Sequence, residues 1–231
     1  MNKKLTLKNA NIAIKDGKIT IEFDKDNLIE ETSDICPSNN NQVELSELNP
    51  GDEFRIGFGS PVYVVVDHIG STTKVISKEI THATAFNYDK SDIDYDKNNN
   101  YLVSDIREIL NNHAYDYITN YIDKHNIVPT KCDTTAMDGS GSYGTSEENI
   151  TILSLDEYRR YYDILNTIPN FTSELQWLCT PVSLKNKAKP FVCIINRDGL
   201  IEYMYSNIQD IGVRPFFTLK SSTEVIPYTG N

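Results

Sequence analysis

The sequence predicts an α+β fold with antiparallel sheets, two or three helices and a preceding β-hairpin. Strand patterns fill residues 54–80, helical patterns follow, and further strand patterns close the chain, an order typical of α+β domains. Val62-Tyr63-Val64-Val65-Val66 shows no alternation of apolar and polar residues, as expected of a strand buried on both faces. Ser154-Leu155-Asp156-Glu157 matches the capping box that begins a helix.

The N-terminal part of the chain differs from the rest in its pattern. In residues 3–24, isoleucines alternate with polar residues around Asp16-Gly17, which predicts a hairpin with a type I′ turn. An isolated hairpin is marginally stable in water, so we expect it to pack on the main domain, a second copy or a partner. The predicted segments are a docking hairpin, a linker or strap, a main domain and a C-terminal tail, at residues 1–30, 31–48, 49–220 and 221–231.

The main domain begins with a three-strand meander followed by two helices. The first helix is expected to start at Ser104 or Asp105 and to end at Asn111-Asn112, and the second stops before Pro129. Residues 130–148 are rich in Gly, Ser and Thr and predict a surface loop. The remaining expected elements are strands at 54–58, 62–69, 73–80, 150–153, 177–180, 191–195, 200–205 and 213–219, and a helix at 155–165.

Composition excludes some classes of partner. The chain has 231 residues, a net charge of -11 and acidic residues spread along its length. No basic stripe is present to displace phosphate counterions, so we expect no nucleic-acid binding. No apolar run reaches the about 18 residues that span a bilayer, and no apolar segment follows the basic start at Lys3-Lys4. We therefore expect synthesis in the cytoplasm without a signal peptide, and no membrane partner.

Five short strings occur in order within residues 49–220. They are Gly51-Asp52-Glu53-Phe54 with 63–66, Ser104-Asp105-Ile106-Arg107-Glu108-Ile109-Leu110-Asn111, Ile152-Leu153-Ser154-Leu155-Asp156-Glu157, Trp177-Leu178-Cys179-Thr180-Pro181 and Gly212-Val213-Arg214-Pro215. Together they resemble a family of uncharacterised bacterial and phage domains marked by W-L-R-S-P and G-V-R-P strings. Cys179 and Thr180 replace the Arg and Ser of that pattern, so no role of the family's Arg carries over.

The closing layout, a Trp strand, two hairpin strands and a Gly-Val-Arg strand, is also similar to C-type-lectin-like domains. That resemblance implies a scaffold that binds sugars or proteins through its loops, by analogy of fold alone. Residues 3–30 resemble short β-rich proteins encoded among phage structural genes. Both resemblances together imply a virion component with a docking segment and a displayed domain.

Metal and cofactor binding are not expected. Four residues match positions 1, 3, 5 and 7 of a calcium loop, namely Asp92, Asp94, Asp96 and Asn98. Lys97 stands in the glycine position of that loop and Val103 in the position of the bidentate Glu, so a solvated acidic loop is favoured. The acid-proline strings of calcium-dependent lectins are absent from the sequence. The four cysteines contain no C-x-x-C spacing and are expected to be reduced and mostly buried.

No set of residues indicates an enzyme. Gly139-Ser140-Gly141-Ser142-Tyr143-Gly144 lacks the Lys-Ser/Thr of a P-loop, and His113 and His125 have no nucleophile nearby in sequence. A spatial pair of carboxylates stays open as a glycosidase-type alternative. Cys179 and Cys193, on neighbouring predicted strands, remotely resemble the paired copper-binding cysteines of sulfatase-activating enzymes that share the C-type-lectin-like fold. Buried thiols are the favoured interpretation.

Binding residues are expected on the 130–148 segment. The candidate contact residues are Asp138, Ser140, Ser142 and Tyr143. Trp177 and Arg214 are expected to have structural roles, since a lone Trp usually anchors a core and a buried Arg must be paired with an acid or carbonyls. Tyrosines near both helices predict half-buried faces. They are Tyr115, Tyr117, Tyr121, Tyr158, Tyr161 and Tyr162.

These observations favour a non-enzymatic phage virion protein, such as a capsid decoration or tail-associated module. It would contact virion proteins or self-associate through the N-terminal hairpin. The first alternative is an adhesin module that binds a carbohydrate or protein on a host surface. The second is an uncharacterised enzyme.

Overall fold

The computed structural model describes residues 11–15, 18–22, 42–88, 99–185 and 190–230. The chain divides into two compact units, Met1–Asn41 and Gln42–Asn231. In the first unit, β1 (Asn11–Lys15) pairs antiparallel with β2 (Lys18–Glu22), with Ile12 opposite Ile21. The pairing agrees with the predicted hairpin, whose turn residues lie outside the described part of the chain.

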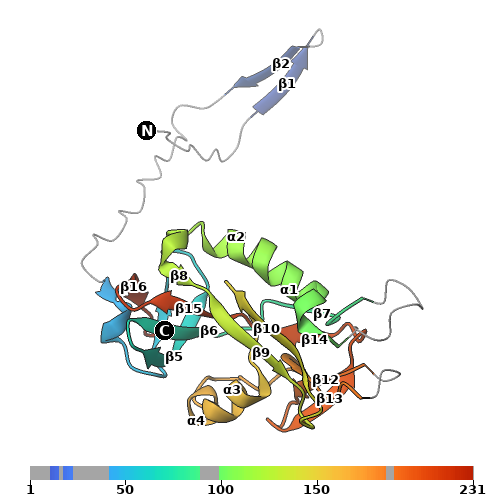
Figure 1. Ribbon diagram of the computed structural model, residues 1–231. Helices are drawn as coiled ribbons and strands as arrows, with labels where there is room; N and C mark the ends of the chain where they lie inside the picture. Colours follow the sequence, from blue (N-terminus) through green and yellow to red (C-terminus); the bar gives the residue numbers. More distant parts are fainter. Residues whose placement is uncertain (1–10, 16–17, 23–41, 89–98, 186–189, 231) are drawn as a thin grey trace. The chain divides into compact units, whose positions relative to one another are not determined.

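The second unit contains a curved seven-stranded sheet in which every pairing is antiparallel (Figure 1). Its spatial order is β3 (Val43–Glu44), β16 (Glu224–Pro227), β4 (Glu53–Arg55), β5 (Val62–Ile69), β6 (Thr72–Ser77), β15 (Phe216–Lys220) and β8 (Ile127–Val128). The predicted meander is confirmed, because β4, β5 and β6 are neighbours. The compact unit is longer than the expected 49–220 at both ends, because β16 pairs with both β3 and β4.

A five-stranded sheet forms the second layer. Its order is β13 (Ile201–Tyr205), β12 (Phe191–Ile195), β11 (Gln176–Pro181), β14 (Ile211–Val213) and β7 (His82–Thr84). Only the contact of β11 with β14 is parallel among these described pairings. The predicted α+β class with mainly antiparallel sheets is thus confirmed. The expected single strand at 213–219 is wrong, because Pro215 has no N–H for the ladder and the chain passes there from β14 to β15 in the other sheet.

The predicted surface loop at 130–148 is also wrong. Residues Thr130–Thr135 form β9 and Ser142–Glu148 form β10, which pair as an antiparallel hairpin. Thr130, Cys132 and Thr134 are buried while the residues between them are exposed. This alternation is that of a half-buried strand, and the small polar residues of the segment concealed it.

The first helical region is continuous where two helices were predicted. The region starts with the short helix η3 (Tyr101–Val103). Three further helical segments then follow one another without a break, namely α1 (Asp105–Ile109), η4 (Leu110–Ala114) and α2 (Tyr115–Ile118), of which η4 is a π-helical turn. Ser104 is the N-cap, as one of the two expected starts. Asn111 does not end the helix, because its side chain bonds the backbone N–H and C=O of Ile150 at 3.2 and 2.9 Å.

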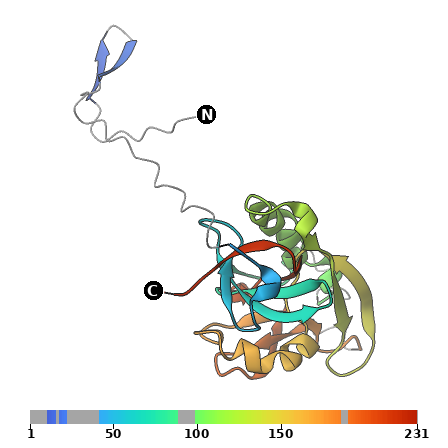
Figure 2. The same cartoon turned by 90° about the vertical axis from the view of Figure 1, so that its left-hand side faces the viewer.

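The second helical region begins at the predicted capping box. It comprises α3 (Leu155–Arg160) and α4 (Tyr162–Leu165), and the only residue between them is Tyr161. In both ribbon views α1 and α2 lie on one side of the strands and α3 and α4 on the other (Figures 1 and 2). The remaining short elements are η2 (Leu45–Glu47) and η5 (Lys124–Asn126). The expected strand at 150–153 is reduced to a bridge between Thr151 and Phe216.

Strand β5 separates two hydrophobic clusters, which explains its unbroken apolar run. Tyr63 and Val65 belong to a cluster with Trp177, whereas Val64 and Val66 belong to another with Tyr158. Alternate side chains of a strand point to opposite faces, so both faces of β5 are core faces. The prediction for residues 62–66 is confirmed.

Candidate functional site

A pocket lies between the outer face of β9 and helix α3. Its volume is about 210 Å³. The exposed side chains of β9, Lys131, Asp133 and Thr135, form one wall. They share a face because they stand at every second position of the strand. Sequence reasoning missed them, although the alternating string from Thr130 to Thr135 carried the signal.

The opposite wall comes from α3, whose start is fixed by hydrogen bonds. The Ser154 hydroxyl accepts from the Glu157 amide at 3.2 Å, and the Ser154 amide donates to the Glu157 carboxylate at 3.0 Å. The Leu155 amide donates to the hydroxyl of Thr180 on β11 at 2.9 Å. The hydroxyl of Thr180 therefore ties α3 to the five-stranded sheet.

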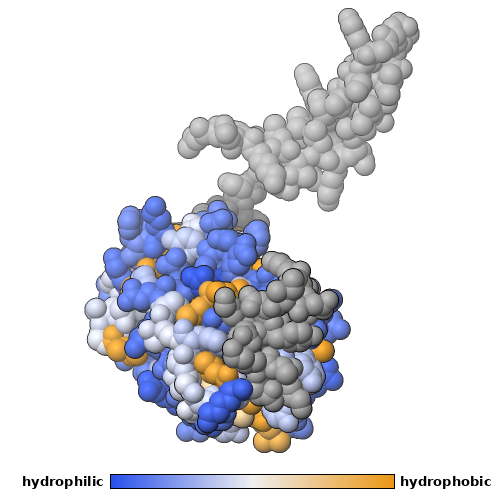
Figure 3. Space-filling model, turned by 45° about the vertical axis from the view of Figure 1, so that its right-hand side comes forward, coloured by the Kyte–Doolittle hydropathy of each residue, from blue (hydrophilic) through white to orange (hydrophobic). Residues whose placement is uncertain are grey.

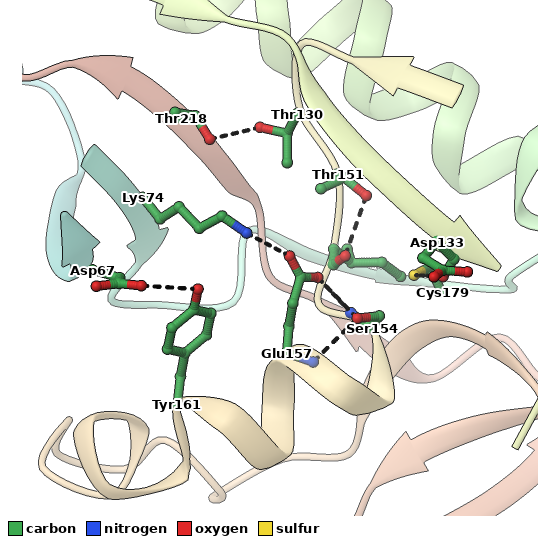
Figure 4. A network of polar contacts seen from close by, with 11 residues as sticks. Asp67, Lys74, Thr130, Asp133, Thr151, Ser154, Glu157, Tyr161, Cys179 and Thr218 are labelled. Atoms are coloured by element: carbon green, nitrogen blue, oxygen red, sulfur yellow. Dashed lines mark hydrogen bonds and ion pairs between the residues drawn. The ribbon is translucent and has the colours of Figure 1, made fainter. Parts of the chain in front are cut away.

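Glu157 links the pocket to the seven-stranded sheet (Figure 4). Its other carboxylate oxygen accepts from Nζ of Lys74 on β6 at 2.8 Å. The Lys74 ammonium also lies 5.7 Å from the centre of the Tyr161 ring, and the Tyr161 hydroxyl donates to Asp67 at 3.2 Å. Burial raises the pKa of Tyr161, so its hydroxyl is protonated at neutral pH. Both oxygens of Glu157 are occupied, and this carboxylate is a structural link.

The other charged side chains of the pocket are only partly engaged. One oxygen of Asp133 accepts from the amide and hydroxyl of Thr135 at 2.9 and 2.6 Å. Arg159 lies 3.4 Å from Asp156, and both side chains are largely exposed. Lys131 and Arg160 also line the pocket, and neither forms an ion pair with another described residue. Apart from the Asp156–Arg159 and Glu157–Lys74 pairs, the charged side chains of the pocket are the cations Lys131 and Arg160 and the partly bonded carboxylate of Asp133.

The predicted contact residues gather at the tip of the β9–β10 hairpin, beside the pocket but not in its walls. Asp138 accepts from the Ser140 amide at 2.8 Å, and hydrogen bonds from Ser140 and Ser183 lower its pKa to about 2. The Ser140 hydroxyl accepts from the Leu184 amide at 2.8 Å. Tyr143 donates to Asn99 at 2.6 Å. These bonds attach the tip to the rest of the fold.

Ser142 completes the predicted contact set. Its hydroxyl donates to the carbonyl of Gly144 and lies 3.2 Å from the hydroxyl of Thr134. The backbone amide of Met137, at the same tip, donates to the carbonyl of Pro181 at 2.9 Å. The tip of the segment predicted as a surface loop is therefore held to the rest of the fold by hydrogen bonds.

Trp177 and Arg214 lie in the interior, away from the pocket. The Trp177 indole N–H donates to the carbonyl of Thr84 at 2.9 Å. The Arg214 guanidinium is 5% exposed and stacks over the Phe171 ring at 4.6 Å. It donates to Gln176 Oε1 and to three carbonyls, those of Phe171, Ser77 and Lys78. Burial lowers its pKa to about 10, which leaves it charged at neutral pH.

The described cysteines are buried free thiols. Cys132 and Cys179 belong to one hydrophobic cluster and Cys193 to the other. Burial raises the pKa of Cys193 to about 12. The hydrogen bond with Cys132, together with burial, raises the pKa of Cys179. Cys179 and Cys193 therefore do not share a face of the sheet. Cys36 lies outside the described residues.

Other residues considered from the sequence are not brought into the pocket. His113 and His125 are exposed at the long helical region and after it. The candidate calcium positions 92–98 lie outside the described residues. In the described part of the chain, no three His, Cys, Asp or Glu side chains are grouped so as to hold a metal ion. Within the same residues, no helix has the length and apolar composition to cross a membrane.

The tyrosines near the helices are partly buried rather than gathered into a ligand site. Tyr158 and Tyr161 are buried in a core cluster, while Tyr117 and Tyr162 are exposed. Burial raises the pKa of Tyr158. The surface drawn in Figure 3 is mostly hydrophilic, with separate hydrophobic patches.

No family model, curated protein or solved structure matches the chain. The resemblances drawn from the sequence strings thus remain predictions.

Proposed function

We propose that this protein is a non-enzymatic binding module of the C-type-lectin-like class, with the β9–α3 pocket as its ligand site. The observation that carries the proposal is the pocket itself, in which polar side chains from two elements face an open space of about 210 Å³. Pockets with a few converging polar groups are the usual place for a ligand.

The state of the pocket's hydroxyls and carboxylates supports binding over catalysis. Ser154 is engaged in the helix cap and Thr180 accepts from a backbone amide. Glu157 holds Lys74 and the cap, so it is not poised as a base.

A nucleophile needs a neighbouring base within hydrogen-bond reach. The Thr135 hydroxyl donates to Asp133 at 2.6 Å and the Ser154 hydroxyl donates to Glu157 at 3.0 Å. The same two carboxylates also accept from the backbone amides of Thr135 and Ser154, so both pairs belong to a local turn and a helix cap.

The experiment compares wild-type protein with Thr135→Trp, which fills the pocket, on an array of neutral and acidic glycans. The matched control is Thr229→Trp, an exposed Thr just after β16 that does not line the pocket. We expect binding by the wild type and the control and its loss in Thr135→Trp. The proposal would be rejected if both variants bound glycans equally well. It would also be rejected if the wild type bound no glycan on the array and, in a separate assay, no host cell surface.

We also propose that the module is carried on a phage virion, docked by residues 1–30 to virion proteins or to a second copy. The support is that Met1–Asn41 forms a unit separate from the binding unit and contains the β1–β2 pair. A two-stranded hairpin requires further packing to be stable. Mass spectrometry of purified particles should find the protein in stoichiometric amounts, and particles made with a chain lacking residues 1–30 should not contain it. Absence of the full chain from particles would reject this placement.

A further inference from the structure

We infer that the β9–α3 pocket binds a carboxylate-bearing sugar, with Lys131 and Arg160 at the carboxylate and the aromatic residues of β12 and β13 at the neighbouring sugar ring. The inference rests on the proposed binding function and adds the class of ligand. It assigns a calcium-independent site to residues that were not among the contact residues expected from the sequence.

The size of the pocket limits what enters it. Drug-sized ligands occupy pockets of roughly 300–1,000 Å³. A volume of about 210 Å³ is smaller, which suits a single sugar ring rather than a folded peptide segment. The rest of a longer ligand would lie on the adjoining surface.

The charge of the pocket selects an anion. Asp156 is paired with Arg159 and Glu157 with Lys74, so these four charges largely cancel. The remaining charged residues that line the pocket are Lys131, Arg160 and Asp133, and Oδ1 of Asp133 already accepts from Thr135. Arg160 also lies by the Tyr161 hydroxyl. A carboxylate between Lys131 and Arg160 would form charge-assisted hydrogen bonds, the stronger kind in proteins.

Hydroxyl groups of a ligand also find partners there. Oδ2 of Asp133 accepts no hydrogen bond from the described residues, and the carboxylate of Asp156 is exposed. Carboxylate oxygens accept from sugar hydroxyls. The acids in the walls disfavour a phosphate chain, as does the net charge of -11. The mixture of two cations with acceptors therefore fits an acidic sugar better than a nucleic acid.

An exposed aromatic cluster lies on β12 and β13. Phe191 on β12 lies 4.9 Å from Tyr203 and 4.4 Å from Tyr205, measured between ring centres. Tyr203 is 53% and Tyr205 44% exposed, at the end strand of the five-stranded sheet. Such rings are amphipathic, and their faces pack on the C–H faces of pyranose rings.

Met137 connects the pocket to this aromatic cluster. It lines the pocket, and its Sδ lies 3.7 Å from Sγ of Cys193. Cys193 is the direct cross-strand partner of Tyr203, and Arg159 of the pocket wall acts electrostatically on the same thiol. Directly opposite residues of an antiparallel pair share a face of the sheet. A ligand leaving the pocket past Met137 therefore meets the aromatic rings.

The test measures Kd for oligosaccharides of a uronic acid, for sialylated oligosaccharides, and for the carboxyl-reduced neutral form of each. We expect the full-length protein to bind at least one acidic form about tenfold or more tightly than its neutral form. Raising the salt concentration should weaken the acidic complex, because exposed charge pairs are screened. Comparing the Kd for the uronic acid oligosaccharides with that for the sialylated ones shows which type of sugar supplies the carboxylate.

Variants locate the site. Lys131→Gln and Arg160→Gln should each weaken acidic binding about tenfold and thereby reduce the preference for the acidic over the neutral form. Lys220→Gln, an exposed Lys at the end of β15, is the control. Tyr203→Ala should weaken binding of both acidic and neutral forms, while the exposed Tyr117→Ala should not.

Equal affinity for acidic and neutral sugars would overturn this inference and leave the binding function intact. Equal loss in the Lys220→Gln control would also overturn it. If no sugar binds but a host protein does, the class of ligand is wrong. If neither binds, the proposed function fails as well.

Discussion

The junction of the two large sheets, where Arg214 stands between β14 and β15, and the β9–α3 pocket both contain positively charged side chains. The two regions differ in what those side chains bond. At the junction, every described acceptor of Arg214 is a neutral group of the protein itself, and the guanidinium is 5% exposed. In the pocket, Lys131 and Arg160 are exposed and form no ion pair with a described residue.

The difference follows from desolvation. A buried charge without partners costs several kcal/mol, so a fold retains one only where its hydrogen bonds are complete. An exposed charge keeps its water and can exchange that water for a ligand. We therefore expect the junction to determine stability and the pocket to determine binding, and four measurements test this division.

The largest effect is expected for Arg214→Ala. This change removes a stacked guanidinium and its hydrogen bonds to Gln176 Oε1 and to the carbonyls of Phe171, Ser77 and Lys78. Gln176 Oε1 loses its donor, whereas the carbonyl of Phe171 keeps Nε2 of Gln176. The lost packing and the unpaired buried acceptors should lower the free energy of unfolding by about 3–5 kcal/mol. Urea unfolding checks this, with the exposed Arg197→Ala as the control. A loss of similar size in both variants would contradict the assignment of the junction.

Gly212→Ala should have the next largest effect. A Cβ built at Gly212 would lie 2.5 Å from Cδ1 of Ile80 and 2.9 Å from the carbonyl oxygen of Leu175. The side chain of Ile80 can move, but the carbonyl is bonded to the Gly212 amide and cannot. Overpacking of this kind costs about 1–3 kcal/mol. Thermal unfolding against Gly57→Ala, whose nearest atom is at 3.4 Å, measures it, and equal Tm values would refute it.

Alkaline pH should weaken the interior by a smaller amount. Burial raises the pKa of Cys193 to about 12, while a thiol in the unfolded chain titrates near 8.5. Between these values the unfolded chain releases the proton and the folded chain keeps it. The contribution is therefore complete below about pH 8.5 and is lost as the pH rises, by at most about 1.4 kcal/mol per pH unit. Between about pH 9 and 11, the free energy of unfolding of Cys193→Ala should therefore decline less steeply with pH than that of the wild type. Parallel declines in the two proteins would argue against this prediction.

The smallest effect on stability is expected in the pocket. Lys131→Gln and Arg160→Gln change exposed side chains without ion-pair partners in the described chain, so each should alter the free energy of unfolding by less than about 0.5 kcal/mol. Urea unfolding of both variants, beside that of Arg214→Ala, completes the comparison. A loss above about 2 kcal/mol in either would show that the pocket cations serve the fold.

Local patterns accounted for much of the fold. The capping box at Ser154 and Glu157 and the two-faced strand β5 follow from spacing and hydrophobicity alone, and both were predicted. Asn111 misled the helix assignment because its side-chain amide bonds the distant backbone of Ile150 and the carbonyl of Arg107 one turn earlier, and the helix continues past it. A side chain that finds a tertiary partner no longer acts as a local signal.

The candidate site was less accessible to such reasoning. Four contact residues were placed on the 130–148 segment, and they do lie together at the hairpin tip beside the pocket. Lys131, Asp133 and Thr135 were missed because a run of Thr, Lys, Cys and Asp has weak hydrophobic contrast. Once β9 packs on the core, that same run separates into an inner and an outer face.

The sequence by itself determined the α+β class, the start of α3 and the burial of β5, since each depends on interactions between near neighbours. It also indicated that Arg214 must find neutral or acidic partners, because burial of a charge requires them. Only the tertiary structure decided which acceptors those are and which cations face the pocket. Lys131 and Arg160 come from separate elements, β9 and α3, and a local pattern within one element cannot indicate which residue of another element it will meet.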